Sequence, residues 1–452
     1  MASDLKNPSI SLHNGHNGAK SIENPQPKKF LFVDWESLNG DLAWQVQKEG
    51  HEVKMYIKEQ TDVDVYDGIL TKVSDWENEV GWADVIVFDD TGFGTKADKL
   101  RKAGKLVVGG SQYTDQLEDD REFGQSEMGR VGMLTLPHLD FNNYDEAIAF
   151  LKNNPGRYVW KPSGYISSDF KGILFLGKEE DGRDIMELLE HNKTAWVKKI
   201  KNFQLQKFAS GVEVAVGAFF NGQDFVYPIN VNFEHKKLFP GDIGPYTGEM
   251  GTLMYWSPPN TIFNATLSKM KEDLKKCGYV GYIDINCIAN ARGIYPLEFT
   301  CRFGYPTISI QMEGVTSQWG EFLYTLASGQ PFDLKVKKGF QIGAVIAVPP
   351  FPYSDKREFE IYRDISILFK KPNNLDGVHI GDVKLIEGDW RLAGESGYAL
   401  VVTGSGVTAA EARQQMYSRI SNIMLQSMFY RTDIGMRWAH DSDKLQTWGY
   451  LY

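Results

Sequence analysis

Length, composition and charge exclude several classes of protein. The 452 residues allow two to four domains with a large core, and 42% hydrophobic with 24% charged residues is ordinary for a globular protein. The net charge of −10 argues against a nucleic-acid-binding surface, and three cysteines without CxxC spacing indicate neither a disulfide framework nor a zinc site.

The start of the chain and its apolar runs bear on where the protein works. Residues 1–28 are rich in Ser, Asn, Gly and Pro, which predicts a disordered leader. No apolar run is long enough to span a membrane, and no signal-peptide pattern opens the chain. With the sparse cysteines, these features predict a cytoplasmic protein without a membrane or nucleic-acid partner.

The first ordered part of the chain alternates between apolar runs and helical stretches. A helix is predicted over Leu42–Lys48, and buried strands are predicted over Phe30–Asp34, Glu52–Ile57, Asp84–Asp89 and Lys105–Gly109. This alternation predicts a parallel sheet with helices on both faces. Ligands usually bind such a sheet at the carboxyl ends of its strands, where Asp34, Asp89 and Asp90 would lie. No GxGxxG pattern follows the first strand, which argues against an NAD-dependent dehydrogenase.

From about Asp119 the pattern changes to a mixture of helices and strands. The predicted helices cover Arg121–Val131, Tyr144–Asn153, Leu267–Cys277 and Ala409–Gln426. The predicted strands cover Tyr158–Pro162, Ile173–Leu176, Phe203–Phe208, Val212–Phe220, Tyr279–Ile288, Gly293–Thr300 and Phe340–Val348. The pair Asn221-Gly222 predicts a tight hairpin. The small polar loop Ser167–Gly172 carries Lys171 between two strands, which suits a flap over phosphates.

Two segments carry the residues best suited to chemistry. Gly241–Gly251 is a glycine-punctuated loop with one carboxylate near each end, and glycines let a backbone come close to a ligand. Pro296–Gly304 ends an apolar strand and places Glu298 and Arg302 within a short stretch. A carboxylate that can hold a metal, next to a guanidinium that can hold phosphate, is what phosphoryl transfer from ATP requires.

These two segments, together with Met428–Gly435, resemble the phosphoribosylamine–glycine ligases, which are ATP-grasp enzymes. The resemblance covers about residues 29–436. It implies an α/β fold, α+β in parts, with ATP-grasp architecture. The implied parts are the leader 1–28, an N-terminal parallel α/β domain over 29–118, an ATP-grasp domain over 119–335 with a small lid subdomain at about 157–225, a C-terminal β-rich domain over 336–436 and a tail over 437–452.

The resemblance also implies roles for particular residues, with ATP and Mg²⁺ (or Mn²⁺) as cofactors. The ATP-binding residues would be Lys161, Lys171, Gln206, Lys207, Phe208 and Glu213, with the backbone at Gln206 to Phe208 reading the adenine. The metal would be held by Glu298 with Asn286 or Asp284 from the neighbouring strand. Catalysis would depend on Arg302, Lys171 and Asp242. The substrate would meet the loop at Asp242, Gly244, Pro245, Thr247 and Gly248.

The implied reaction joins glycine to phosphoribosylamine through an acyl phosphate, so the partners would be small molecules and the protein a monomer or homodimer. Three departures from the family pattern stand out. The segment Asp34–Gly40 replaces a glycine-rich turn that binds the substrate phosphate, Tyr305-Pro306-Thr307 replaces an acidic-Pro-acidic run, and Thr300 replaces an asparagine near the metal glutamate. A ligase with another amine acceptor therefore stays open, as does a non-catalytic nucleotide-binding regulator.

Overall fold

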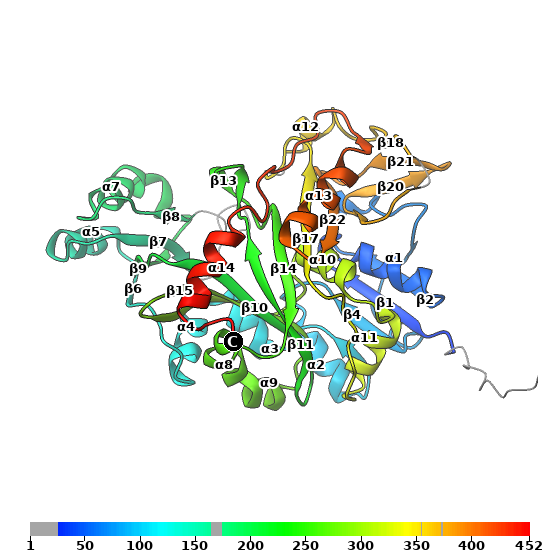
Figure 1. The fold of residues 1–452 in the computed structure, drawn as a ribbon, viewed down its shortest axis with the longest axis horizontal. Coiled ribbons are helices and arrows are strands. Elements are labelled where there is room, and N and C mark those ends of the chain that lie inside the picture. The colour runs from blue at the N-terminus through cyan, green and yellow to red at the C-terminus, as the bar shows by residue number, and fades with distance from the viewer. Residues whose placement is uncertain (1–25, 164–173, 354, 372–373) are drawn as a thin grey trace, which may run out of the picture.

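The computed structural model describes residues 26–163, 174–353, 355–371 and 374–452 (Figure 1). Most of the predicted leader, and the predicted flap with Lys171, lie outside these residues. Within the described part of the chain, no helix is long and apolar enough to cross a membrane.

The N-terminal part contains a five-stranded parallel sheet in the order β3-β2-β1-β4-β5, as the alternating pattern predicts. Its strands are β1 (Lys29–Asp34), β2 (Glu52–Ile57), β3 (Thr71–Lys72), β4 (Val85–Phe88) and β5 (Leu106–Val108), and its helices are α1 (Gly40–Lys48) and α2 (Gly94–Lys102). Strand β1 is central and its residues 30–34 are buried, because both faces of the sheet are covered.

A small lobe projects from one side of the molecule (Figure 1). It contains the sheet β6-β9-β7-β8 with two helices, formed by β6 (His138–Phe141), α5 (Tyr144–Asn153), β7 (Tyr158–Ser163), β8 (Phe175–Leu176), α7 (Arg183–Trp196) and β9 (Asn202–Lys207). The lobe has a core of its own, in which Trp160 stacks on Trp196 with ring centroids 4.8 Å apart. The helices α3 (Gln112–Asp119) and α4 (Arg121–Arg130) precede it in the chain.

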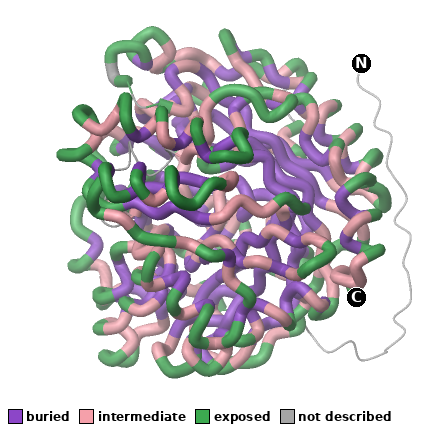
Figure 2. Tube along the Cα trace, turned by 90° about the vertical axis from the view of Figure 1, so that its left-hand side faces the viewer, coloured by how far each residue is buried: buried purple, intermediate pink, exposed green. Residues whose placement is uncertain are grey.

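The main body is built on an eight-stranded antiparallel sheet in the order β16-β15-β10-β11-β14-β17-β22-β19. Its strands are β10 (Val212–Asn221), β11 (Phe225–Glu234), β14 (Gly251–Ser257), β15 (Val280–Asn290), β16 (Gly293–Thr300), β17 (Phe340–Ala347), β19 (Val378–Ile380) and β22 (Tyr398–Gly406). The sheet continues across position 335, where the domain boundary is predicted. Figure 2 shows these buried strands inside a shell of exposed turns.

Further helices and short strands of the described residues complete the fold. They are η1 (Gln60–Asp62), η2 (Glu77–Glu79), α8 (Thr261–Ala265), η3 (Leu267–Met270), α9 (Lys271–Cys277), α10 (Thr307–Gly314), α11 (Trp319–Ala327), α12 (Lys356–Phe359), β12 (Lys237–Phe239), β13 (Ile243–Tyr246), β18 (Leu368–Phe369), β20 (Val383–Ile386), β21 (Asp389–Leu392), α13 (Ala409–Ile420), β23 (Ile423–Met424) and α14 (Trp438–Thr447).

The predicted helix Ala409–Gln426 is too long by six residues. Helix α13 ends at Ile420, and the chain then enters β23, which pairs with β18. The backbone N–H of Lys370 also donates to the carbonyl of Asn422. A tertiary strand pairing has overridden the local helical pattern.

Candidate active site

Strand β16 carries Glu298 to the face of the main sheet where charged side chains gather. In the register of the strands, Glu298 lies opposite Asn286 and Thr300 lies opposite Asp284, because a bulge between Asn286 and Cys287 shifts the hairpin by one residue. Helix α4 fixes this end of the strand, because the side-chain amide of Gln125 donates to the carbonyl of Leu297 over 2.7 Å.

Two cations lie next to the Glu298 carboxylate. The Lys236 ammonium is 3.4 Å from Oε1, and the Arg121 guanidinium is 3.6 Å from Oε2. Burial works against ionisation of Glu298, but Lys236, Arg121 and Lys161 outweigh it and lower its pKa to about 2. The carboxylate is therefore ionised at neutral pH, and its side chain is 43% exposed, so a ligand can reach it.

Lys236 stands at the centre of a group of carboxylates. Its ammonium is 3.2 Å from Glu213 and 3.5 Å from Glu234, in addition to its contact with Glu298. Burial opposes its charge, yet these three carboxylates hold the pKa of Lys236 well above its usual value. Glu213, predicted to bind the ribose, thus lies within the same charged group as the predicted metal carboxylate.

The two candidates for a second metal ligand differ in their environment. Asp284 and Asn286 are both buried, and among the described residues neither Oδ1 atom has a hydrogen-bond partner. The amide nitrogen of Asn286 lies 3.4 Å from Glu234, so its Oδ1 is directed elsewhere. Burial and the negative charge of Glu234 raise the pKa of Asp284 well above its usual value. The amide oxygen of Asn286, opposite the ionised carboxylate of Glu298, suits Mg²⁺. This ion binds oxygen ligands and usually takes only one or two of them from the protein.

Among the described residues, protein side chains alone do not form a complete metal site. Within the described ranges, no group of three or more His, Cys, Asp or Glu side chains could hold a metal ion. Such a result is compatible with Mg²⁺ that arrives with a nucleotide, because the phosphates then supply several of its ligands.

Lys161 is the buried cation on the lobe side. It lies on β7, is 7% exposed, and donates to the side-chain oxygen of Gln206 over 2.8 Å. Burial lowers the pKa of Lys161 to about 7, and Arg121 adds to the effect. Gln206 therefore positions Lys161 through its side chain, a contact that the prediction of backbone recognition did not include.

The predicted reading of adenine by the backbone at Gln206 to Phe208 stays a prediction. The N–H of Lys207 donates to the carbonyl of Pro137, and the N–H of Phe208 donates to the carbonyl of Arg157. Both N–H groups are thus bonded to other backbone groups of the protein in this structure. The Lys207 ammonium lies 4.1 Å from the ring centre of Tyr158.

Arg302 follows β16 and is bound by carboxylates. Its Nε lies 2.8 Å from Asp90 and 3.0 Å from Glu118, and its Nη1 donates to the carbonyl of Phe303. Glu118 also accepts from the backbone N–H of Cys301 over 2.7 Å. Arg302 thus forms salt bridges with both Asp90 and Glu118 in this structure. Its catalytic role stays a prediction.

The glycine-punctuated loop forms the β12–β13 hairpin. Asp242, at its tip with a φ of 56°, lies 2.9 Å from the buried guanidinium of Arg431. The Thr247 hydroxyl donates to the carbonyl of Lys236 over 2.9 Å, which ties the hairpin to the cation beside Glu298. In this structure Asp242 fixes the loop to Arg431. Its predicted role in catalysis stays untested, as do the predicted substrate contacts of the loop, at Gly244, Pro245, Thr247 and Gly248.

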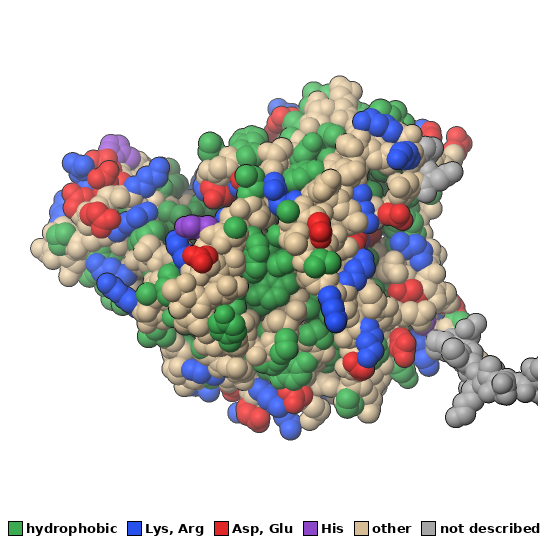
Figure 3. Space-filling model, viewed as in Figure 1, with side chains coloured by type: hydrophobic (Ala, Val, Ile, Leu, Met, Phe, Trp, Pro, Cys, Tyr) green, Lys and Arg blue, Asp and Glu red, His purple; other side chains and the backbone are tan. Residues whose placement is uncertain are grey.

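Sequence reasoning missed several charged residues of this site. Arg121 is predicted only as part of a helix, Glu249 only as the second carboxylate of the glycine-punctuated loop, and Lys236 and Glu234 have no predicted role beside Glu298. Glu249 is 7% exposed and accepts from the hydroxyls of Thr252 and Thr307. One signal for Glu234 is present in the sequence, since it ends a strand in which apolar residues alternate with polar ones. Figure 3 shows the surface indented where the lobe meets the main body.

The fold and this charged site define a class of protein. The family model of the phosphoribosylglycinamide synthetase ATP-grasp (A) domain matches residues 119–308, so this part of the chain is an ATP-grasp domain. About four-fifths of the chain is similar to the phosphoribosylamine–glycine ligases, as the motifs predict. The enzyme of Streptococcus pneumoniae is 26% identical over 372 residues, which cover 80% of this chain and 85% of that relative. The enzyme of Listeria monocytogenes is 26% identical over 355 residues, covering 75% and 80%.

Solved structures support the same fold. The phosphoribosylamine–glycine ligase of Thermotoga maritima superposes with a TM-score of 0.68 at 20% identity, covering 90% of this chain and 100% of that chain. The N5-carboxyaminoimidazole synthetase of Staphylococcus aureus, solved with ADP, superposes with a TM-score of 0.55 at 14% identity, covering 87% and 97%. The α/β fold with an N-terminal parallel sheet and antiparallel sheets after it is therefore confirmed.

Proposed function

We propose that this protein is an ATP-dependent carboxylate–amine ligase that forms an amide through an acyl phosphate. Glycine and phosphoribosylamine are the leading substrates, with glycinamide ribonucleotide, ADP and phosphate as products. The similarity to phosphoribosylamine–glycine ligases over four-fifths of the chain supports this pair. The protein would then serve purine biosynthesis in the cytoplasm, as a monomer or homodimer.

The observation that carries the proposal is the group of charges around Glu298. An ionised carboxylate lies within 4 Å of the cations of Lys236 and Arg121, and Lys161 faces the same group from the lobe. Transfer of a phosphoryl group from ATP needs fixed positive charge at the phosphates and a carboxylate for the metal. This arrangement argues against the non-catalytic alternative.

The residues of the proposed site would bind the metal, the phosphates, the ribose and the acyl phosphate. Glu298 and Asn286 would hold Mg²⁺ (or Mn²⁺), which neutralises the transferring phosphoryl group when bound. Lys161, Lys236 and Arg121 would bind phosphate oxygens, and Glu213 would bind the ribose hydroxyls. Arg302 would stabilise the acyl phosphate once that group draws it from Asp90 and Glu118.

The variant Glu298→Gln tests the metal assignment. The amide keeps the shape of the side chain but loses the negative charge, so we expect ADP release to fall about 100-fold or more. The measurement is ADP release with Mg-ATP, glycine and freshly generated phosphoribosylamine, with the product identified by mass.

The matched control is Glu272→Gln on the exposed surface of α9, which should keep wild-type turnover. Thermal unfolding of both variants checks that they are folded. Turnover of the Glu298→Gln protein within threefold of wild type would contradict the metal role of Glu298.

A second candidate keeps the same mechanism but takes another amine acceptor. One observation favours it. Two buried carboxylates lie at the turn after β1, those of Asp34, the last residue of β1, and of Asp89, which follows β4. Asp89 accepts from the backbone N–H of Trp35 at 3.0 Å. That N–H is thus bound to a carboxylate at the place where the related ligases are expected to bind a phosphate.

A further inference from the structure

The Lys236 ammonium lies among carboxylates that come from three strands of the main sheet. Its Nζ is 3.2 Å from Glu213 Oε1 on β10, 3.5 Å from Glu234 Oε2 at the end of β11, and 3.4 Å from Glu298 Oε1 on β16. An ammonium group has three N–H donors, and each of these carboxylates offers it one oxygen. A single lysine is thus the shared counter-ion of all three carboxylates.

One of these carboxylates belongs to the proposed metal ligand Glu298. Its Oε1 faces Lys236, and its Oε2 lies 3.6 Å from the guanidinium of Arg121. The amide of Asn286 lies in the same group, because its Nδ2 is 3.4 Å from Glu234. Asn286 is only 5% exposed, and its Oδ1 has no hydrogen-bond partner among the described residues. A buried oxygen without a partner, opposite Glu298 in the strand pairing, indicates that a ligand binds here.

A free divalent cation would compete with the Lys236 ammonium for the same oxygens. Mg²⁺ binds its oxygen ligands at about 2.0–2.1 Å, so an ion on Glu298 Oε1 would lie beside the ammonium. Two positive charges that close repel each other strongly where little water separates them. With Lys236 in its observed position, the three carboxylates are therefore closed to a metal ion that arrives alone.

The Lys236 side chain can leave this position without a change in the backbone. The side chain is 21% exposed, and a lysine carries its charge on a flexible four-carbon stem. The backbone is fixed, because the carbonyl of Lys236 accepts from the N–H of Thr247 over 2.8 Å and from the Thr247 hydroxyl over 2.9 Å. The ammonium can therefore turn to another partner while the backbone keeps it at the edge of the site.

Nucleotide phosphates are the group best suited to draw the ammonium away. A triphosphate carries several negative charges, and hydrogen bonds between oppositely charged groups are stronger than those between neutral ones. Arg121 lies on the other oxygen of Glu298, so the proposed phosphate site adjoins Lys236. Transfer of the ammonium to the phosphates would leave Glu298 Oε1 open to a metal ion that the phosphates carry.

We propose that Lys236 is a displaceable counter-ion that closes the metal-binding carboxylates until a nucleotide binds. In the nucleotide-free protein its ammonium neutralises Glu298 and excludes divalent cations. The phosphates of a bound nucleotide then take the ammonium, and Glu298 becomes available to the metal. Metal and nucleotide bind together, and each raises the affinity for the other by the same factor. The inference rests on the metal site of the proposed function and makes Lys236 a positioning residue for it.

The test is Mn²⁺ binding in the absence of nucleotide, measured by ultrafiltration and by the electron paramagnetic resonance signal of the free ion. We expect Lys236→Met to bind Mn²⁺ about tenfold or more tightly than wild type, because three carboxylates lose their counter-ion. Lys236→Gln should show the same gain. Lys236→Arg keeps the positive charge and should stay within about twofold of wild type. With a non-hydrolysable ATP analogue present, the wild type should retain Mn²⁺ together with the nucleotide.

Two controls connect the gain to these carboxylates. Lys237→Met removes a cation at the next position, where the ammonium donates to the carbonyl of Gly244 and lies 3.6 Å from the ring centre of Tyr246. This variant should bind nucleotide-free Mn²⁺ within about twofold of wild type. Adding Glu298→Gln to Lys236→Met should abolish the gain. Thermal unfolding of each variant checks that it is folded.

Wild-type protein that binds Mn²⁺ as tightly without the ATP analogue as with it would overturn the inference, whether or not the variants fold. No gain in folded Lys236→Met or Lys236→Gln would also overturn it, as would an equal gain in Lys236→Arg. The Mn²⁺ assay needs no turnover, so ADP release with glycine and phosphoribosylamine tests the ligase reaction separately. The expected Mn²⁺ pattern without turnover would support the inference and contradict only the ligase assignment.

Discussion

At the scale of the residue, burial lowers the pKa of Lys161, so its charge becomes sensitive to a bound ligand. Its ammonium is bound by the neutral side chain of Gln206, and its pKa of about 7 leaves it largely uncharged at pH 8. A triphosphate beside it would favour the charged form and restore a higher pKa. The protein should therefore take up a proton when the nucleotide binds.

We expect ATP binding to take up about one proton at pH 8 and almost none at pH 5.5, where Lys161 is charged in both states. The measurement is calorimetric titration in two buffers of different ionisation enthalpy. The variant Lys161→Met should bind ATP more weakly and take up no proton. Identical binding enthalpies in both buffers at pH 8 would contradict the assignment of Lys161 to the phosphates.

At the scale of the element, the C-terminal helix α14 is part of the main body. The tail 437–452 had no assigned role from the sequence. In the structure, the Trp438 ring lies 5.0 Å from Phe233, 5.5 Å from Tyr255 and 5.0 Å from Phe340, each in an edge-on arrangement. Arg437 donates to the carbonyl of Glu234 over 2.7 Å, which links the start of the helix to the charged site.

Replacing Trp438 by Ala should lower the free energy of unfolding by about 2–3 kcal/mol, because three aromatic contacts and a half-buried indole are lost. Urea unfolding at pH 7 measures the change. The control is His440→Ala on the same helix, where the side chain is 71% exposed and little change is expected. A loss below 0.5 kcal/mol in the Trp438 variant would show that the tail contributes no packing energy.

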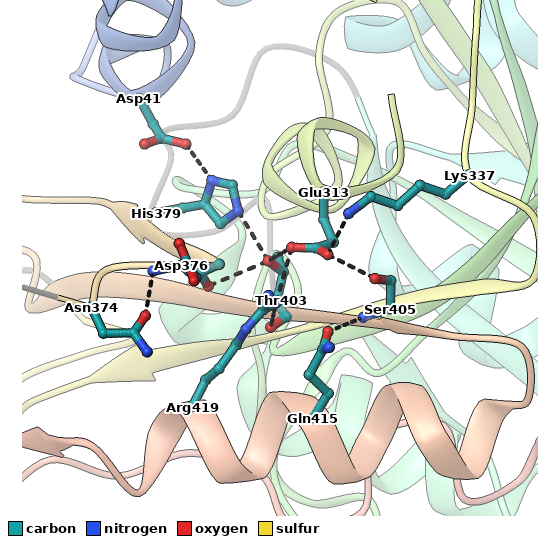
Figure 4. A network of polar contacts seen from close by, with 11 residues as sticks. Asp41, Glu313, Lys337, Asn374, Asp376, His379, Thr403, Ser405, Gln415 and Arg419 are labelled. Carbon is teal, nitrogen blue, oxygen red and sulfur yellow. Dashed lines mark hydrogen bonds and ion pairs between the residues drawn. The ribbon is translucent and has the colours of Figure 1, made fainter. Parts of the chain in front are cut away.

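At the scale of the whole molecule, Glu313 connects the central and C-terminal parts. It lies on α10, with its side chain 6% exposed, and binds Arg419 over 3.0 Å and Lys337 over 2.8 Å. It also accepts from the hydroxyls of Thr403 and Ser405. Burial opposes ionisation, but Lys337 and Arg419 lower the pKa of Glu313 to about 2 (Figure 4).

The pKa of Glu313 is lower in the folded protein than in the unfolded chain. Glu313 therefore stabilises the protein above about pH 4.3, and this stabilisation is lost as the pH falls toward 2. We expect Glu313→Gln to lower the free energy of unfolding by about 3 kcal/mol at pH 7. The difference from wild type should shrink between pH 5 and pH 3. Urea unfolding at several pH values measures it, with the exposed Glu321→Gln as control. A difference that grows as the pH falls would contradict this linkage.

Much of the local structure could be predicted from the sequence, because strands and helices follow from side-chain period and turn chemistry. The range of β2, the helix α5 and the strand β16 agree with their predictions, and the Asn221-Gly222 turn joins β10 to β11. In each case the pattern lies within neighbouring residues.

The partners of the site residues could not be predicted in the same way. Lys236 and Glu298 are 62 positions apart, so no local pattern records their contact. The same holds for Arg302, whose carboxylate partners come from the N-terminal sheet and α3. The order of neighbouring residues in the sequence determined the strands, the helices and the ATP-grasp motifs. Only the packing of distant elements decided which charges surround Glu298, because those contacts depend on how separate parts of the chain fold against one another.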